Sequence, residues 1–198
     1  MNVMISHKKS LNILKRTKAL LDGHFILSSG LHSPKYIQCA KLLSYPYIAN
    51  KICNSFAKKI NNTFKSIDLI LAPAMGGVII GHEIGRILKI ETIFCERVNG
   101  EFILRRGFNI TKGAKVLIIE DVITTGKSSL ECVKLIKKSK AKLIGFASII
   151  DRSTTKNLKI KKNIISHMKI NVPSYTKNQL PESLKSIPIT VPGSRFIK

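Results

Sequence analysis

The sequence predicts an α/β fold with a central parallel sheet flanked by helices. Short runs rich in branched apolar residues alternate along the chain with segments whose apolar residues recur at helical spacing. The expected strands lie near residues 67–72, 92–96, 114–120 and 143–150. Because parallel strands present their carboxyl ends at one edge of a sheet, we expect the loops after these strands to form the functional face.

The composition is that of a globular protein with a strongly basic balance. The chain has 198 residues, enough for one domain over 1–198 with a substantial core, and 44% of them are hydrophobic. No apolar run approaches the roughly 18 residues of a membrane span. The N-terminal apolar residues are interleaved with Lys and Arg, unlike those of a secretory signal. We therefore expect a cytoplasmic protein with no membrane segment.

The formal net charge of +23 has two interpretations. It could indicate nucleic-acid binding. However, Lys far outnumbers Arg, the lysines are spread along the whole chain, and Ile and Asn are also frequent, a pattern typical of compositional bias in an AT-rich genome. We favour that bias, although a positive field would also attract a polyanionic substrate.

Four cysteines are scattered along the chain: Cys39, Cys53, Cys95 and Cys132. Their spacing matches no CxxC or other metal-ligand pattern. We expect each to be a reduced thiol that is buried or half-buried.

The first forty residues combine a helical pattern with a hairpin-like segment. Apolar residues at helical spacing predict a helix over 11–21 that ends at Asp22-Gly23. Two extended runs, 25–27 and 35–38, then flank a Ser/Gly/His/Pro loop, which is typical of a hairpin.

Glycines mark the junction after the first strand of the sheet. The expected elements here are a helix over 47–64, the strand over 67–72 and a helix over 78–88. The loop 73–77 contains Gly76 and Gly77, which would let the backbone approach a ligand closely. Gly81 and Gly85, four residues apart, would let the following helix pack closely on the sheet.

A second hairpin is expected after the strand over 92–95. Asn99-Gly100 is a strong two-residue turn signal. The strand before it ends in Glu96-Arg97, and the segment after it carries Arg105 and Arg106. We expect a flexible arm over about 97–108 that projects from the sheet.

The rest of the chain is organised around residues 116–129. The apolar run 116–119 ends in Glu120 and Asp121, and the polar loop 124–128 opens a helix expected over 128–139. The amino end of a helix is a ready anion site. Carboxylates repel phosphate, so the acids suit the hydroxyls of a ligand whose phosphate lies in the loop. That ligand is a ribose phosphate.

Two alternatives apply to this segment. Thr124, Thr125 and Ser128 could be ordinary N-cap residues. Gly126-Lys127-Ser128 matches the end of a P-loop, but that pattern requires Gly at position 121, where this chain has Asp.

The last expected strand of the sheet, 143–150, is followed by Asp151 and Arg152, which would place Arg152 on the ligand side. A basic strand-like run over 158–170 and a Pro-punctuated tail complete the chain. No internal repeat or low-complexity linker is present.

Residues 116–129 resemble the 5-phosphoribosyl 1-diphosphate (PRPP) motif of type I phosphoribosyltransferases. The resemblance implies that family's fold, a central parallel sheet with an N-terminal hood, mainly from 1–40, and a flexible β-hairpin arm. It also implies a set of PRPP-binding residues: Glu120, Asp121, Val122, Ile123, Thr124, Thr125, Gly126, Lys127 and Ser128. In that family the loop equivalent to 73–77 packs against the diphosphate of PRPP.

The hairpin near the N-terminus is similar to the hood motif of orotate phosphoribosyltransferases, which is matched by Phe25, Leu27, Ser29, Gly30, Ser33 and Tyr36. This resemblance implies orotate contacts from the hood, from Thr124 and from Arg152. Many members have Lys at the position of Ser28, so that contact is not carried over. His32 is a candidate replacement, and a surface histidine is the equal alternative.

In the same family the arm closes over the active site of the neighbouring subunit, which implies a homodimer. Arg97 matches the arginine at the strand end, while Val98 stands where Lys is common. The arm offers Arg105 and Arg106 and neither Lys nor His, so Arg97, Arg105 and Arg106 are the candidate catalytic residues at the diphosphate.

The implied reaction joins orotate to PRPP and yields orotidine 5′-monophosphate and diphosphate, a pentosyl transfer in pyrimidine (UMP) biosynthesis. The implied cofactor is Mg²⁺, bridging diphosphate and ribose oxygens, with no metal ligand assigned to the chain. Two rivals stay open. A purine phosphoribosyltransferase would share 116–129 without needing the hood or Arg152, and a nucleic-acid-binding regulator could keep the fold without catalysis.

Overall fold

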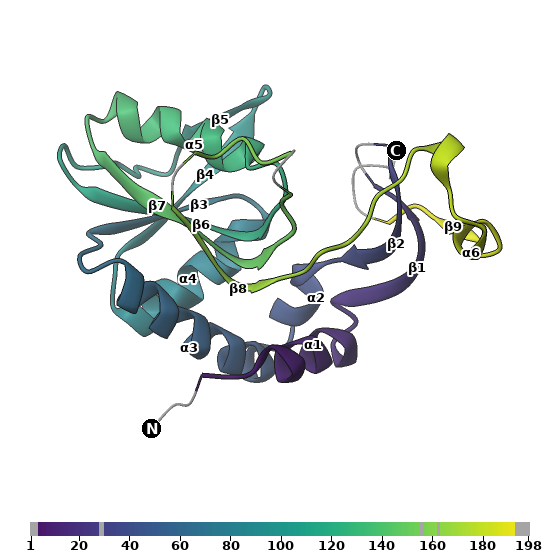
Figure 1. The fold of residues 1–198 in the computed structure, drawn as a ribbon. Coiled ribbons are helices and arrows are strands. Elements are labelled where there is room, and N and C mark those ends of the chain that lie inside the picture. Colours follow the sequence, from purple (N-terminus) through teal and green to yellow (C-terminus); the bar gives the residue numbers. More distant parts are fainter. Residues whose placement is uncertain (1–3, 28–29, 155–156, 162, 193–198) are drawn as a thin grey trace.

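The computed structural model describes residues 4–27, 30–154, 157–161 and 163–192. It has two parts, a six-stranded sheet covered by helices and a smaller three-stranded hood (Figure 1). Within the described residues, no helix combines the length and the apolar character needed to cross a lipid bilayer.

The large sheet confirms the predicted parallel α/β architecture. Its strand order is β5-β4-β3-β6-β7-β8, and only the edge strand β5 is antiparallel to its neighbour. The strands are β3 (Leu69–Pro73), β4 (Thr92–Val98), β5 (Glu101–Leu104), β6 (Lys115–Ile123), β7 (Lys142–Asp151) and β8 (Ile164–Lys169). β3 is apolar and buried throughout, and β6 is apolar and buried from Val116 to Ile119, as expected for strands that are covered on both faces.

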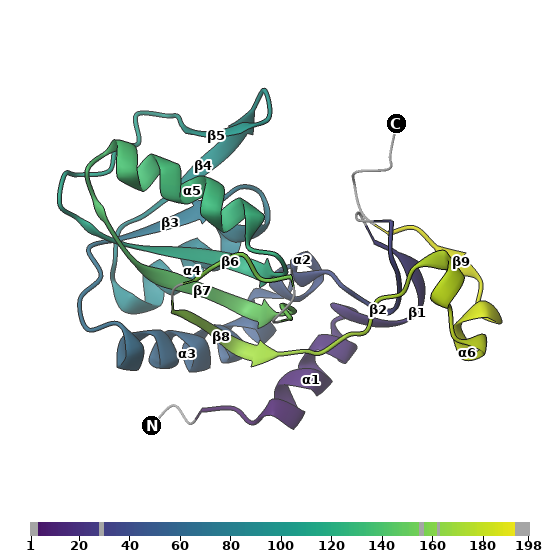
Figure 2. The ribbon, with the colours of Figure 1, turned by 45° about the horizontal axis from the view of Figure 1, so that its top comes forward.

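Helices cover both faces of this sheet (Figures 1 and 2). On one face lie α1 (His7–Arg16), α2 (Cys39–Leu43), α3 (Pro46–Thr63) and α4 (Gly76–Leu88), and on the other lies α5 (Lys127–Lys138). The side chains of β6 alternate accordingly, since Leu117 and Ile119 join the first core and Val116 and Ile118 the second. The four cysteines are free and buried, as predicted.

Glycine allows α4 to lie close to the sheet, as its spacing predicts. A Cβ atom on Gly81 would come within 2.8 Å of Ala72 Cβ, and one on Gly85 within 2.0 Å of Thr92 Oγ1. Both distances are far below van der Waals contact, so any side chain at these positions would push α4 outward. The middle and the carboxyl half of α4 are thereby held close to β3 and to the start of β4.

The hood is a hairpin of β1 (Leu20–Ile26) and β2 (His32–Ile37), to which β9 (Ile189–Thr190) adds a parallel strand. The predicted hairpin is confirmed, but the predicted helix over 11–21 is too long. Helix α1 ends at Arg16, Lys18 takes a left-handed backbone with φ 53°, and Leu20 already pairs with Ile37 across the hairpin. Leu20 and Leu21, which helical spacing assigned to the helix, therefore belong to β1 and pair with β2.

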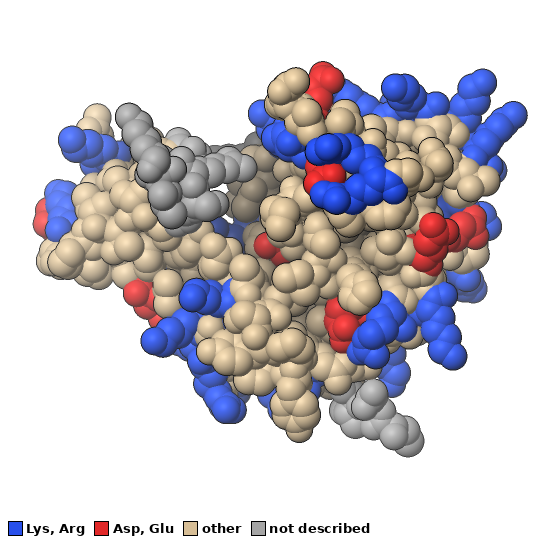
Figure 3. All heavy atoms as spheres, turned by 180° about the vertical axis from the view of Figure 1, so that it is seen from behind, with Lys and Arg blue, Asp and Glu red and all other residues tan. Residues whose placement is uncertain are grey.

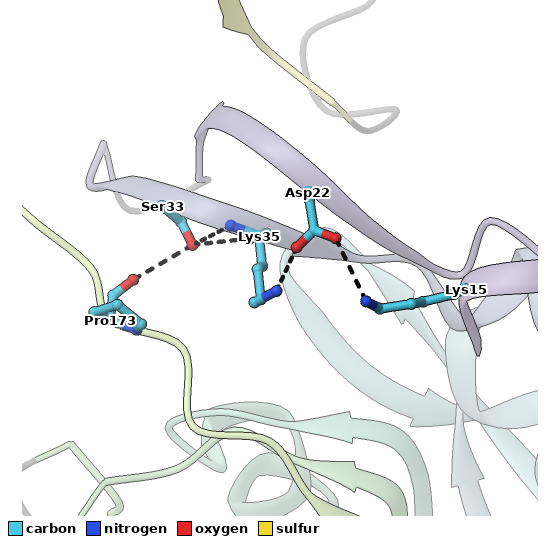
Figure 4. A network of polar contacts seen from close by, with 5 residues as sticks. All are labelled: Lys15, Asp22, Ser33, Lys35 and Pro173. Carbon is cyan, nitrogen blue, oxygen red and sulfur yellow. Dashed lines mark hydrogen bonds and ion pairs between the residues drawn. The ribbon is translucent and has the colours of Figure 1, made fainter. Parts of the chain in front are cut away.

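The C-terminal segment closes the hood, an arrangement that no sequence pattern indicated. Tyr175 exchanges two backbone hydrogen bonds of 2.8 Å with His32, and the Pro173 carbonyl accepts one from Ser33 Oγ at 3.4 Å. The short helices η1 (Lys177–Gln179) and α6 (Glu182–Lys185) then lead to β9. On the outer side of the hairpin, Asp22 pairs with Lys35 and Lys15 (Figure 4).

Two strand boundaries differ from expectation. β6 does not stop at Glu120 but continues to Ile123, because β7 keeps pairing with it as far as Asp151. β8 covers only 164–169 of the predicted run 158–170, and the chain before it contacts the loop after β6 instead.

Candidate active site

Four loops meet at the carboxyl edge of the large sheet, on the side that faces the hood (Figures 1 and 2). Backbone hydrogen bonds tie neighbouring loops together: Ala74 N–H donates to Cys95 O at 2.8 Å, and Arg152 N–H to Ile123 O at 2.8 Å. Lys159 N–H donates to Thr125 O at 3.0 Å. The segments predicted as functional from separate parts of the sequence are therefore brought together at one edge.

Glu120 lies on the α5 face of β6. Its side chain is 8% exposed, and its Oε1 accepts a 2.7 Å hydrogen bond from the hydroxyl of Ser129 on α5. Burial raises the pKa of Glu120 to about 7, an effect that the Ser129 hydrogen bond partly counteracts. Near neutral pH this carboxyl group thus exchanges between its protonated and ionised forms.

Asp121 lies on the opposite face of β6, toward α4. Its Oδ1 accepts a 2.9 Å hydrogen bond from Val122 N–H, and burial raises its pKa. A Cβ atom on Gly76 would come within 2.7 Å of Asp121 Oδ1. Gly76 is therefore required where it stands, because any larger residue would displace the carboxylate. The sequence assigns both acids to the ribose hydroxyls, and strand alternation directs the two side chains toward different helices.

The loop 124–128 opens α5 as predicted. Gly126 is the N-cap with a left-handed φ of 74°, and Lys127 N–H donates to Thr125 Oγ1 at 3.3 Å. A side chain at Gly126 would collide with Ile160, whose Cδ1 lies 2.5 Å from the ideal Cβ position. The first turn of α5 contains no acidic residue, so the partial positive charge of the helix end is not neutralised there. Thr124 is exposed, Ser128 is partly buried, and both lie at this open end.

Arg152 follows β7 at the same edge and lies close to Tyr36 of the hood. Burial lowers the pKa of Arg152, while the nearby Tyr36 opposes that effect. Tyr36 in turn interacts electrostatically with both Arg152 and Asp121. The Nε atom of Arg152 is buried and has no hydrogen-bond partner in the described part of the chain. A buried guanidinium donor without an acceptor is costly in a folded protein, and an acceptor on a bound ligand would satisfy it.

The arm arginines have different surroundings. Arg97 pairs with Glu131 on α5 and lies 4.2 Å from the centre of the Phe102 ring. Arg106 pairs with Glu96 at 3.0 Å and lies 5.7 Å from the centre of the Phe94 ring. Arg105 is exposed and forms no ion pair with any residue that the structure describes. Of the three candidates, Arg105 is therefore the freest to reach a ligand.

The structure describes some of the hood residues singled out in the sequence and not others. Ser28 and Ser29 lie outside the described residues. His32 is not a surface residue, since it is 6% exposed and its Nδ1 lies 2.7 Å from Nε2 of the buried His24. His24 also contacts Ile187 O, at 3.2 Å from Nδ1. Because both rings are engaged inside the hood, His32 does not replace the missing lysine in this arrangement.

Two contributors were missed in the sequence. Gly76 was noted for close approach to a ligand but not for the space that it leaves to Asp121. Ser129 has no predicted role beyond its place in the helix expected over 128–139. The available signal was its position, because it shares the buried stripe of α5 with Cys132 and Ile136 and is the polar member of that stripe.

The basic residues form no single tract on the face shown in Figure 3. Lys and Arg are distributed over it in separate groups, with acidic side chains between several of them. A nucleic-acid interface would favour a continuous basic stripe. The distribution supports the interpretation of the +23 charge as compositional bias.

The pKa of Glu120 predicts a pH-dependent stability. The folded state raises this pKa from 4.5 to about 7, so it binds more protons than the unfolded state between those values. The contribution of Glu120 to the free energy of unfolding is therefore fully present at low pH and is lost as pH rises through about 7. Relative to Glu120→Gln, the wild-type free energy of unfolding should fall by about 3 kcal/mol between pH 4.5 and 8.5.

Denaturant unfolding of both proteins across that pH range measures the difference, with the exposed Glu101→Gln as the control for the substitution itself. Parallel curves for wild type and Glu120→Gln would show that Glu120 ionises normally in the folded protein.

Comparison with known proteins agrees with this geometry. Residues 45–179 match the model of the phosphoribosyl transferase domain family. An orotate phosphoribosyltransferase of Parvibaculum lavamentivorans is 44% identical over 194 residues, covering 98% of this chain and 100% of that protein. One from Caldicellulosiruptor saccharolyticus is 42% identical, covering 95% and 97%.

Solved structures share the fold at low identity. The orotate phosphoribosyltransferase of Aeropyrum pernix superposes with a TM-score of 0.66 at 18% identity, over 80% of this chain and 92% of that one. The adenine phosphoribosyltransferase of Saccharomyces cerevisiae gives 0.63 at 16% identity, over 80% and 99%. The fold is thus common to enzymes for different bases, whereas the full-length relatives at 42–44% identity specify the group. The chain belongs to the orotate phosphoribosyltransferases, within the phosphoribosyl transferase domain family.

Proposed function

We propose that this protein transfers the 5-phosphoribosyl group from PRPP to orotate, giving orotidine 5′-monophosphate and diphosphate, a step in the de novo synthesis of UMP. The relatives named for this activity align over nearly the whole chain. The observation that carries the proposal in this chain is Arg152, a half-buried cation whose buried Nε–H has no partner among the described residues and which lies beside Tyr36 and the PRPP motif.

PRPP is proposed to lie along the end of β6 and the start of α5. The carboxylates of Glu120 and Asp121 accept hydrogen bonds from the ribose hydroxyls. The loop from Thr124 to Ser128 holds the 5-phosphate, mainly through backbone N–H groups at the α5 end. The backbone of Val122 and Ile123 connects the two acids to this loop.

Orotate is proposed to lie between this ribose and the hood. The planar guanidinium of Arg152 suits the fixed acceptors of a pyrimidine ring with a carboxylate, which supply the partner that Nε–H lacks. Thr124, exposed at the loop, lies on the same side. Orotate then presents its ring nitrogen to C1 of the ribose.

The reaction needs no enzyme nucleophile, and the proposed mechanism uses none. The ring nitrogen displaces diphosphate at C1 through a transition state with oxocarbenium character. The protein contributes positioning of the two substrates and stabilisation of the charge that develops on the departing diphosphate. Among the arm arginines, Arg105 is favoured for that second role because Arg97 and Arg106 are held by Glu131 and Glu96.

The proposed reaction is also compatible with magnesium. The described residues contain no cluster of three or more His, Cys, Asp or Glu that would form a metal site by itself. Diphosphate and ribose oxygens of PRPP would supply the oxygen ligands that a hard cation prefers. We propose that Mg²⁺, bound with PRPP, neutralises diphosphate charge, while Glu120 and Asp121 orient the ribose.

We further propose that the chain acts as one catalytic domain, works as a homodimer in the cytoplasm, and places its arm over the partner's active site. Support for the shared site comes from the arm itself, where Arg105 is exposed and, although it lies in the field of Glu96, forms no ion pair with a described residue of its own chain. Four free cysteines suit a reducing compartment.

Purine bases and nucleic acid remain the alternatives to test. The fold is compatible with a purine acceptor, as the adenine enzyme of similar structure illustrates. Against it stand the hood hairpin, Arg152 and the relatives at 42–44% identity. Against a nucleic-acid regulator that has lost catalysis stands the intact acid pair, Glu120 and Asp121.

Purified protein with PRPP and Mg²⁺ should consume orotate, seen as loss of the orotate absorbance. Asp121→Asn should lower the rate strongly, because the amide donates where the carboxylate accepts. Conversion of purine bases in place of orotate would show that orotate is not the acceptor base. No conversion of any base, together with salt-sensitive binding of DNA or RNA, would overturn the transferase proposal.

Arg152→Ala should raise the KM for orotate roughly tenfold to hundredfold, the value of losing a hydrogen bond to a charged group, and leave the KM for PRPP nearly unchanged. Arg86→Ala is a matched control, since Arg86 is exposed and pairs with Glu83 at the end of α4 that lies away from the site. A rise in the KM for PRPP alone would show that Arg152 does not bind the base.

The shared arm predicts complementation between two inactive variants. If Arg105→Ala and Asp121→Asn homodimers are both inactive, mixing them under conditions that exchange subunits should restore activity. The restored site would combine an intact site in one protomer with an intact arm in its partner. If subunit exchange is verified and activity stays absent, the arm serves its own subunit.

A further inference from the structure

Ser129 is a buried hydroxyl in a position that otherwise takes apolar residues. It is 0% exposed and lies on the sheet-facing stripe of α5, one turn before Cys132. A hydroxyl buried there is costly unless it is hydrogen-bonded. Its partner is Oε1 of Glu120, at 2.7 Å.

The same contact is the main restraint on Glu120. This carboxylate ends a side chain with three rotatable bonds, and the Ser129 hydroxyl is the group in the described structure that forms a side-chain hydrogen bond with it. Backbone pairing of β6 with β7 places the Cα atom of Glu120 but not its carboxylate. Without Ser129, the carboxylate could rotate within the site.

We propose that Ser129 is a positioning residue for PRPP, whose hydroxyl holds the Glu120 carboxylate in the orientation that receives the ribose hydroxyls. This inference rests on the proposed function, because it assigns Ser129 a role in that same reaction. Ser129 itself lies behind Glu120 and acts through it. One oxygen of Glu120 is occupied by Ser129, which leaves Oε2 for the ligand.

The electrostatic surroundings of Glu120 add a second effect. The groups that act on it are Asp121 on its own strand and Glu131 on α5, both of which raise its pKa in addition to burial. Cys132, also on α5, interacts with Glu120 as well. Ser129 lowers the pKa by donating to the carboxylate. Removing the hydroxyl therefore raises the pKa of Glu120 further, and a protonated Glu120 is a poorer acceptor for ribose hydroxyls.

The test is Ser129→Ala in the full-length protein, with Ser148→Ala as the matched control. Ser148 is equally buried and pairs in register with Glu120 on β7, but its hydroxyl donates to Ile150 O at 3.0 Å. Ser129→Ala should lower kcat/KM for PRPP about tenfold, the value of one hydrogen bond to a charged group, with the KM for orotate unchanged. The acidic limb of its pH profile should move to higher pH, and Ser148→Ala should show neither effect.

A double-mutant comparison separates positioning from general packing. In a Glu120→Ala background, Ser129→Ala should cause little further loss, because its hydroxyl has no carboxylate left to hold. If Ser129→Ala reduces activity equally in both backgrounds, or behaves as Ser148→Ala does, the proposal is wrong.

A readout that does not depend on activity separates this inference from the proposed function. The pH dependence of unfolding should shift to higher pH in Ser129→Ala relative to wild type. A wild type that turns over no orotate would defeat the proposed function, while this shift would still report the Ser129–Glu120 contact. No shift would defeat the contact, and with it the positioning role.

Discussion

The end of β6 is the constraint on which the site depends. Two adjacent carboxylates on one strand must point to opposite faces, so each one meets a different helix. Glu120 meets Ser129 at the start of α5, and Asp121 lies against Gly76 at the start of α4. The amino ends of both helices are consequently fixed relative to the same strand end. Glu120 and Asp121 therefore connect the loop 124–128 and the loop 73–77 to the same strand end.

Burial gives these acids their chemical character. Both carboxyl groups have raised pKa values because burial disfavours their charged forms. The folded protein bears this electrostatic cost in the absence of ligand. In the proposed complex, ribose hydroxyls would donate to these carboxylates and favour their ionised forms, as expected for a preorganised site.

The hood depends on both ends of the chain. Its hairpin comes from the N-terminal region, yet Tyr175 and β9 from the C-terminal region complete its sheet. The buried pair of His24 and His32 connects the hairpin to this segment through Ile187 O. Tyr36, which interacts with Arg152, is carried on the same hairpin. The position of the hood relative to Arg152 is therefore set by contacts that join residues more than a hundred positions apart.

The sequence by itself determined the alternating α/β order and the family, because hydrophobic period and the residues 116–129 are local signals. Only the tertiary structure decided where α1 ends, since Leu20 pairs with the distant Ile37. It also decided that His32 is buried, that Arg97 forms an ion pair with Glu131, and that Arg106 forms one with Glu96. The physical reason is the same in each case: these outcomes depend on partners that only folding brings within contact distance.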